Sequence, residues 1–173
     1  MRTVSMQDNL QEYSYTCVEP VGTNFDPAFK PPLTPKQMFE LGVFGGNYFE
    51  GFHDEYPKEW FKKAKLSKLP RTAGYEGWYD KNCNYFRIKA SQSRDEWIRK
   101  GWMHKDDPRG WFQWYCRYYL GRRHEDDARQ IDRWVKMTRH IRWLQNACEV
   151  GNIHCRPRQR QVLLHWAYDS RKL

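Results

Sequence analysis

The last helix that the sequence predicts begins with three arginines, Arg156, Arg158 and Arg160. The first turn of a helix normally favours Asp or Glu, so cations at this position depart from the local rule. Guanidinium groups beside free backbone amides can grip a phosphate, because both supply donors to the same anion. Arg122 and Arg123 repeat the pattern ahead of the preceding long helix. Both helix starts are therefore predicted to bind phosphate.

A second basic feature follows one face of that long helix, predicted over residues 125–148. Its members recur every three or four positions: Arg129, Arg133, Lys136 and His140. Such a stripe can follow a phosphate backbone, although many helical charge stripes are merely solvated. Ion pairing with Glu149, Asp169 or the acidic run at 125–127 is the alternative interpretation of the arginines, and it would contribute little.

Three scattered residues, Cys148, His154 and Cys155, raise the question of zinc, with His104, Cys116 or His124 as completing ligands. Structural zinc sites favour short spacings such as Cys-x-x-Cys, because one turn then supplies two ligands. The sequence has no such pair, and a single buried Cys usually behaves as a small hydrophobic residue. We therefore expect neither a metal nor another cofactor.

Hydrolytic chemistry has two candidate clusters, the run His124-Glu125-Asp126-Asp127 and the pair Asp106-Asp107 beside Lys105 or Arg109. Carboxylates next to a base can hold Mg²⁺ and direct a water at phosphate. Both clusters also have structural explanations, because Asp107 precedes Pro108 as a helix cap and residues 125–127 complement a helix dipole. The sequence shows no glycine-rich phosphate loop with a Lys-Ser/Thr end and no Ser or Cys nucleophile motif.

The elements that must position these residues are mostly helical. Capping and stop signals predict helices near residues 35–41, 56–66, 93–101, 108–121, 125–148 and 156–169. Residues 85–90 are the single strand candidate, and 70–84 are predicted as a loop. We expect a mainly α fold: a single compact domain, 35–173, with a helical carboxyl-terminal bundle, a loop-rich aromatic amino-terminal part and at most one short β element. Residues 1–34 are predicted as an extended arm.

Aromatic residues supply much of the expected core, with nine Trp, eleven Tyr and nine Phe. Disordered chains are poor in such residues, because they cannot bury enough apolar area to offset chain entropy. The helix near residues 108–121 is apolar on nearly every side, which favours a central core helix. Its rings are Trp111, Trp114, Tyr115, Tyr118 and Tyr119, and stacking platforms for unpaired bases are the less favoured alternative.

The charge distribution points to a polyanionic partner. The net charge is +9; residues 1–103 carry 15 Lys or Arg against 13 Asp or Glu, whereas residues 104–173 carry 15 against 8. We therefore predict a nucleic-acid-binding protein, of DNA or RNA, whose basic carboxyl-terminal half contacts phosphates. The predicted contacts are Arg122, Arg123, Arg129, Arg133, Lys136, Arg156, Arg158 and Arg160. Two alternatives stay open: an enzyme acting on nucleic acid, such as a nuclease or base-removing enzyme, and a scaffold for an acidic protein partner.

Cysteine usage and apolar patterning bear on the compartment. Five cysteines, odd in number and widely scattered, are typical of free thiols in a reducing environment. The sequence has no apolar run of about 18 residues, and its first fifteen residues lack the apolar core of a signal peptide. We expect an intracellular protein, cytoplasmic or nuclear, without a membrane span.

Overall fold

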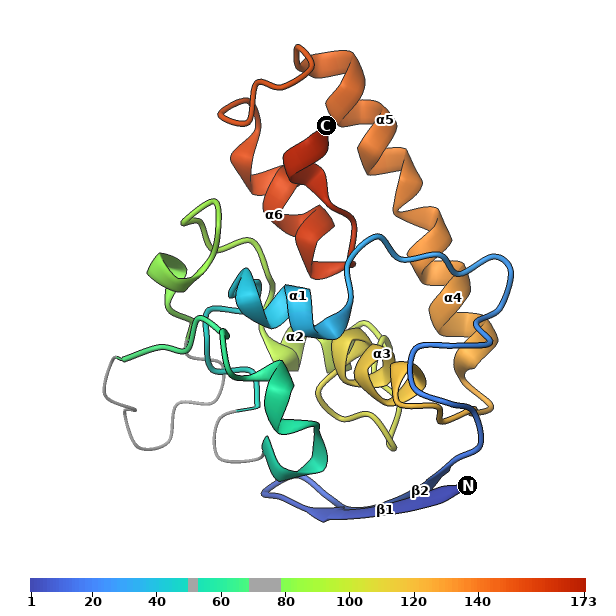
Figure 1. The fold of residues 1–173 in the computed structure, drawn as a ribbon. Coiled ribbons are helices and arrows are strands. Elements are labelled where there is room, and N and C mark those ends of the chain that lie inside the picture. The colour runs from blue at the N-terminus through green and yellow to red at the C-terminus, as the bar shows by residue number, and fades with distance from the viewer. Residues whose placement is uncertain (50–52, 69–78) are drawn as a thin grey trace. The chain divides into compact units, whose positions relative to one another are not determined.

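A computed structural model describes residues 1–49, 53–68 and 79–173 of the chain (Figure 1). Its α-helices are α1 (Pro35–Glu40), α2 (Arg94–Arg99), α3 (Trp111–Tyr119), α4 (Asp127–Lys136), α5 (Thr138–Ala147) and α6 (Pro157–His165). Short 3₁₀ turns lie at η1 (His53–Glu55), η2 (Lys58–Trp60), η3 (Lys81–Cys83) and η4 (Ser170–Lys172). Two strands, β1 (Arg2–Gln7) and β2 (Glu12–Cys17), form the one sheet found in the described residues. The prediction of a mainly α fold with at most one short β element is confirmed.

The chain groups into two compact units, each built from two separated stretches. Unit 1 contains residues 1–30 and 92–136, and unit 2 contains residues 31–91 and 137–173. The chain therefore passes from unit 1 into unit 2 between α4 and α5. The predicted division into an arm, 1–34, and a domain, 35–173, is not tested by this grouping and stays a prediction.

Unit 1 is organised around α3, whose residues 111–118 are all buried. Phe29 packs edge-on against rings of α3 and α4, with ring centroids 5.4 Å from Trp114 and 5.0 Å from Trp134. Such edge-to-face pairs add to the apolar area that the rings bury. The expectation of a central aromatic core helix is confirmed, and the alternative of stacking platforms on this helix is excluded for its buried rings.

The hairpin of β1 and β2, drawn in dark blue in Figure 1, lies in unit 1, where the sequence predicted an extended arm. The strands are antiparallel, with Arg2 opposite Cys17 and Gln7 opposite Glu12. Tyr15 and Cys17 of β2 are buried while Ser14 and Thr16 are exposed, which is the alternation of a half-buried strand. After β2 the amides of Val18 and Glu19 donate to the carbonyl of Gly121, 2.9 and 3.1 Å away.

Unit 2 contains α1, α5, α6 and the 3₁₀ turns. Thr34 caps α1 in a full capping box with Gln37, as the sequence predicted. Helices α5 and α6 pack against each other, and the buried Leu144 and Leu163 belong to their inner faces. The side-chain amide of Gln161 on α6 donates to the carbonyl of Val43, 2.9 Å away.

Two secondary-structure predictions in unit 2 are wrong. Residues 85–90 form no strand, because Arg87 has a left-handed φ of 53° and the side chain of Asn84 holds both backbone groups of Ile88. Residues 56–66 form only the 3₁₀ turn η2 in place of a helix. The loop predicted over 70–84 lies largely outside the described residues.

The helix predicted over 125–148 is two helices, α4 and α5, separated at Met137. The remaining helix predictions hold in place, with α2 capped by Ser93 and α6 beginning at Pro157. Helix α3 starts at Trp111, later than predicted, because Asp107 and Pro108 belong to the preceding turn. No helix in the described ranges has the length and apolar character needed to cross a membrane.

Candidate nucleic-acid interface

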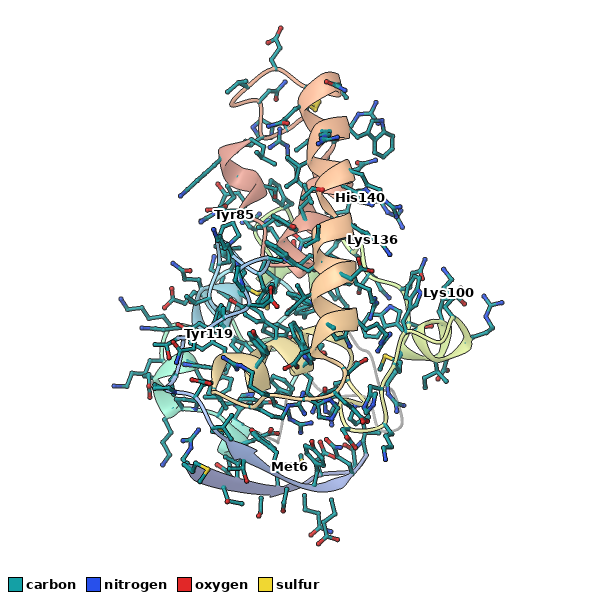
Figure 2. The ribbon with its side chains drawn as sticks, turned by 90° about the vertical axis from the view of Figure 1, so that its right-hand side faces the viewer. Met6, Tyr85, Lys100, Tyr119, Lys136 and His140 are labelled. Carbon is teal, nitrogen blue, oxygen red and sulfur yellow. A yellow bond between two sulfur atoms is a disulfide. The ribbon has the colours of Figure 1, made fainter. Side chains whose placement is uncertain are left out.

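Helix α5 carries a basic outer face in unit 2. Leu144 is buried and Ile141 is partly covered, so the residues between and around these positions point outward. Arg139, Arg142 and Trp143 all lie on this exposed side, at the i, i+3 and i+4 spacing that makes helical residues neighbours. His140 lies on the same helix, one position after Arg139 (Figure 2).

Trp143 is half-exposed, with 50% of its surface open to solvent. The guanidinium of Arg156 lies over its ring, 5.2 Å from the ring centroid. This stacked pair joins the middle of α5 to the residue that precedes α6. A half-exposed indole held by a cation is a surface on which an unpaired base can stack.

Three local features place Arg156 against Trp143. Arg156 has φ 52° and ψ 56°, a left-handed conformation that is uncommon for a residue with a Cβ. Pro157 follows as the first residue of α6. A disulfide between Cys148 and Cys155 closes the connection between the two helices. Strained backbone of this kind persists only where surrounding structure fixes it, and it is common at functional sites.

The arginines of this face have no carboxylate partner in the part of the chain that the structure describes. Among the described residues, the guanidinium of Arg139 bonds the ring of His140, that of Arg156 stacks on Trp143, and the side chains of Arg142 and Arg158 form no hydrogen bond or ion pair. Between residues 137 and 168 the sequence contains a single carboxylate, Glu149. We call the exposed residues Arg139, Arg142 and Trp143 of α5, with the exposed Arg156 and Arg158 at the start of α6, the Trp143 surface.

His140 contributes little positive charge to this surface at neutral pH. Burial, and then the positive charge of Arg139, lower the pKa of its imidazole from 6.5. The charge of the Trp143 surface therefore comes from arginines, which stay protonated at any physiological pH.

Two arginines of the predicted phosphate-binding set are buried, which corrects the expectation that they lie at the surface. Arg160 is 0% exposed and donates to the carbonyls of Cys155, Ser170 and Asn152 at 2.7–2.9 Å. Arg122 is 2% exposed and donates to the carboxylate of Asp107 at 2.6 Å. Their donors serve the fold, so we remove both from the candidate interface.

The other predicted residues of unit 1 hold protein partners. Arg123 lies over the ring of Tyr118 at 4.0 Å and donates to nearby carbonyls. On α4, Arg129 pairs with Asp126 at 2.5 Å, and Lys136 pairs with Asp132 at 2.6 Å.

Arg133, also on α4, donates to the carbonyl of Trp102, 3.1 Å away, and lies over its ring. Burial, and then the charge of Arg129, lower the pKa of Arg133 to about 10. Of the eight predicted contacts, Arg156 stacks on Trp143 and Arg158 is exposed two positions further along, at the start of α6. The α4 residues hold partners within unit 1.

Comparison with family models, with curated proteins and with solved structures gave no match. The assignment of a site therefore depends on this chain's own geometry.

Sequence reasoning missed Arg139, Arg142 and Trp143. The signal was present, because the inward positions Ile141 and Leu144 leave 139, 142 and 143 on the outer side of the helix. The basic stripe predicted from Arg129 to His140 requires one unbroken helix. The break at Met137 separates the stripe's first three members from its last.

The cysteine prediction is partly wrong. Cys148 and Cys155 form a disulfide, whereas Cys17, Cys83 and Cys116 are free thiols. Two cysteines seven positions apart fit a disulfide when the chain reverses between them, and the turn between α5 and α6 supplies that reversal. Neither cysteine of the disulfide is available as a zinc ligand.

The two clusters named above as candidates for hydrolytic chemistry, around residues 104–107 and 124–127, lie together in unit 1. His124 Nε2 lies 2.8 Å from Asp106 Oδ2, and His104 Nε2 lies 3.5 Å from Glu125 Oε1. Asp107 and Asp127 are held by other groups, Asp107 by Arg117 and Arg122, and Asp127 by Trp114 and the amide of His124.

Proposed function

We propose that this protein binds single-stranded nucleic acid through the Trp143 surface of unit 2. The arginines contact backbone phosphates and the ring of Trp143 stacks on an unpaired base. Guanidinium groups match phosphate geometry, and an aromatic ring offers a face to any base. The proposal narrows the sequence-based expectation of nucleic-acid binding to one face of one helix and the start of the next.

One observation carries the proposal: four exposed arginines of α5 and the start of α6, one of them stacked on the half-exposed ring of Trp143, have no carboxylate partner in the described residues. Surface cations in folded proteins commonly sit beside acidic residues, as Lys136 does beside Asp132. Unpaired arginines repel one another, and a bound polyanion relieves that repulsion. Residues 137–173 carry seven Lys or Arg against two Asp or Glu, so the local field favours an anion.

The test is a fluorescence-anisotropy titration of the full chain against labelled single- and double-stranded oligonucleotides of DNA and RNA over a salt series. We expect tighter binding to single strands, because paired bases are not available to stack on Trp143. Equal affinity for single strands, duplexes and heparin would contradict the proposal, since it would mean that charge alone determines binding.

A charge-matched pair of variants separates this surface from general basicity. Arg139→Gln with Arg142→Gln removes two charges from the Trp143 surface, and Lys62→Gln with Lys63→Gln removes two from exposed positions elsewhere in unit 2. For single strands each lost phosphate contact lowers the log–log salt slope by about 0.7. We expect a reduction of about 1.4 for the arginine pair and almost none for the lysine pair. Equal reductions in both would overturn the assignment of the interface.

A further inference from the structure

Unit 1 contains the same four-residue pattern twice, His-Lys-Asp-Asp at 104–107 and His-Glu-Asp-Asp at 124–127. Both copies fold into the same turn. The amide of the third residue donates to Nδ1 of the histidine, at 3.1 Å in each copy. The amide of the fourth residue donates to the histidine's carbonyl, also at 3.1 Å in each copy. We call these segments the twin turns.

The twin turns meet at their histidines. The rings of His104 and His124 are perpendicular, with centroids 4.9 Å apart. Ligand atoms of His104, His124 and Glu125 lie within 4.8 Å of one another. Asp106 joins the group through its contact with His124 Nε2 at 2.8 Å. Two imidazoles and one carboxylate thus converge on one location, and a second carboxylate, Asp106, lies beside both imidazoles.

We propose that this cluster, His104, Asp106, His124 and Glu125, binds one divalent transition-metal ion of the zinc class. Imidazole nitrogen and carboxylate oxygen are both ordinary ligands of zinc, and four of them complete a tetrahedral site. Two carboxylates balance the charge of a divalent ion, and two imidazoles favour zinc, cobalt or nickel over magnesium and calcium. The ion would tie the turn before α3 to the turn before α4.

The other carboxylates of the twin turns are already occupied, which defines the ligand set. Asp107 is 0% exposed between Arg117 and Arg122. Asp126 accepts hydrogen bonds from Arg129 and Gln130. Glu125, in contrast, is three-quarters exposed, and within the described residues its side chain pairs with His104 alone, so it can adjust to an ion.

Metal binding at this site must move two protons. The amides that donate to each Nδ1 place the ring proton on Nε2, the atom that faces the cluster. When the ion takes both Nε2 lone pairs, each ring carries its proton on Nδ1 instead, with solvent carrying the exchange. The amides of Asp106 and Asp126 then lose the ring as acceptor and donate to water. Two ordinary hydrogen bonds are exchanged for two metal–nitrogen bonds.

The first experiment is a titration of the full chain with Co²⁺, followed by its visible absorption, and then displacement of Co²⁺ by Zn²⁺. We expect one ion per chain and a band typical of low-coordinate cobalt with nitrogen ligands. Zinc should also raise the thermal midpoint, because an ion that binds only the folded chain stabilises it. In a ¹H–¹⁵N spectrum the amides of Asp106 and Asp126 should be among the most shifted.

Variants distinguish this cluster from adventitious binding. We expect His104→Gln and Glu125→Gln each to weaken Co²⁺ and Zn²⁺ binding at least tenfold, while His154→Gln, an exposed histidine of unit 2, leaves it unchanged. Glu125 is exposed, so its variant tests the site without disturbing the core. Absence of Co²⁺ and Zn²⁺ binding by the wild-type chain would overturn the proposal. So would equal binding by the His104 variant, or binding of Mg²⁺ as tight as that of Zn²⁺.

Discussion

Replacing Asp107 with alanine should destabilise the protein more than loss of any surface charge. The carboxylate of Asp107 is fully buried and accepts from Arg117 at 2.9 Å and from Arg122 at 2.6 Å. Both guanidinium groups are at most 2% exposed, so neither can turn to water when the carboxylate is removed. Removing one partner of a buried ion pair typically costs about 3–5 kcal/mol. Two buried cations then face each other, so we expect the upper part of that range.

The rings of Tyr13 and Tyr15 do not replace the carboxylate. They lie 4.9 and 5.3 Å from the guanidinium of Arg117 and already contribute in the native protein. A loss near 5 kcal/mol is comparable with the whole stability of many small domains, about 5–15 kcal/mol. The expected outcome is therefore a unit 1 that is partly unfolded at 37 °C.

Urea unfolding followed by circular dichroism measures this effect, with Asp132→Ala as the matched control. Asp132 also pairs with a cation, Lys136 at 2.6 Å, but both side chains are more than half exposed. Exposed i,i+4 pairs contribute about 0.3–0.5 kcal/mol. If the two alanine variants differ by less than about 1 kcal/mol, the account of Asp107 as the charge that holds two buried arginines is refuted.

Three further outcomes follow from particular contacts. Cys148→Ser with Cys155→Ser should lower the stability of unit 2 by about 2 kcal/mol in a urea titration, because the disulfide closes a short loop. Burial lowers the pKa of His165 from 6.5 to about 4, so the unfolded chain takes the proton first. The free energy of unfolding should then fall by up to about 3 kcal/mol between pH 6.5 and 4, and His165→Phe should lack that slope. Gly121→Ala should lower the free energy of unfolding by about 3 kcal/mol in thermal unfolding, because at a φ of +108° the added Cβ would lie 1.9 Å from the Glu19 carbonyl oxygen. The control Gly101→Ala should lower it by only about 1 kcal/mol, because nothing lies within 4 Å of the added Cβ.

Local signals in the sequence predicted the helices well where caps and stops were explicit. Thr34 with Pro35 marks the start of α1, and Ser93 caps α2. The β-hairpin was not predicted although its pairing is local, with the Asp8 side chain accepting from the amides of Leu10 and Gln11 in the turn. What no local pattern encodes is the attachment after β2, where the amides of Val18 and Glu19 bond to Gly121, more than a hundred positions away.

The sequence predicted that arginines form the candidate interface, but it identified only some of the arginines that lie there. Arg156 and Arg158 were identified, whereas Arg122 and Arg160 turned out to be buried. An arginine with internal carbonyl or carboxylate partners has the same sequence signature as one that faces solvent. Only the fold reveals that Arg160 donates to the carbonyls of Asn152, Cys155 and Ser170.

For the twin turns, by contrast, the sequence itself contains a pattern that could have predicted the site. The repeated His-x-Asp-Asp pattern is visible at 104–107 and 124–127, twenty positions apart. Considered one at a time, the first copy predicts a helix cap and the second complements a helix dipole. The packing of unit 1 brings the two turns together, so that His124 contacts Asp106. No local sequence pattern predicts that contact.

The most direct test of the proposed function is the affinity of Trp143→Ala for a labelled single-stranded oligonucleotide, measured beside Trp102→Ala. Trp102 is the matched control, because it is 37% exposed and also lies beside cations, Lys100 and Arg133, but in unit 1. Loss of one base stack costs about 1–3 kcal/mol, so Trp143→Ala should bind roughly 5- to 150-fold more weakly. Its salt slope should stay unchanged, and Trp102→Ala should bind like the wild type. Wild-type affinity in Trp143→Ala, or a larger loss in Trp102→Ala, would contradict the assignment of nucleic-acid binding to the Trp143 surface.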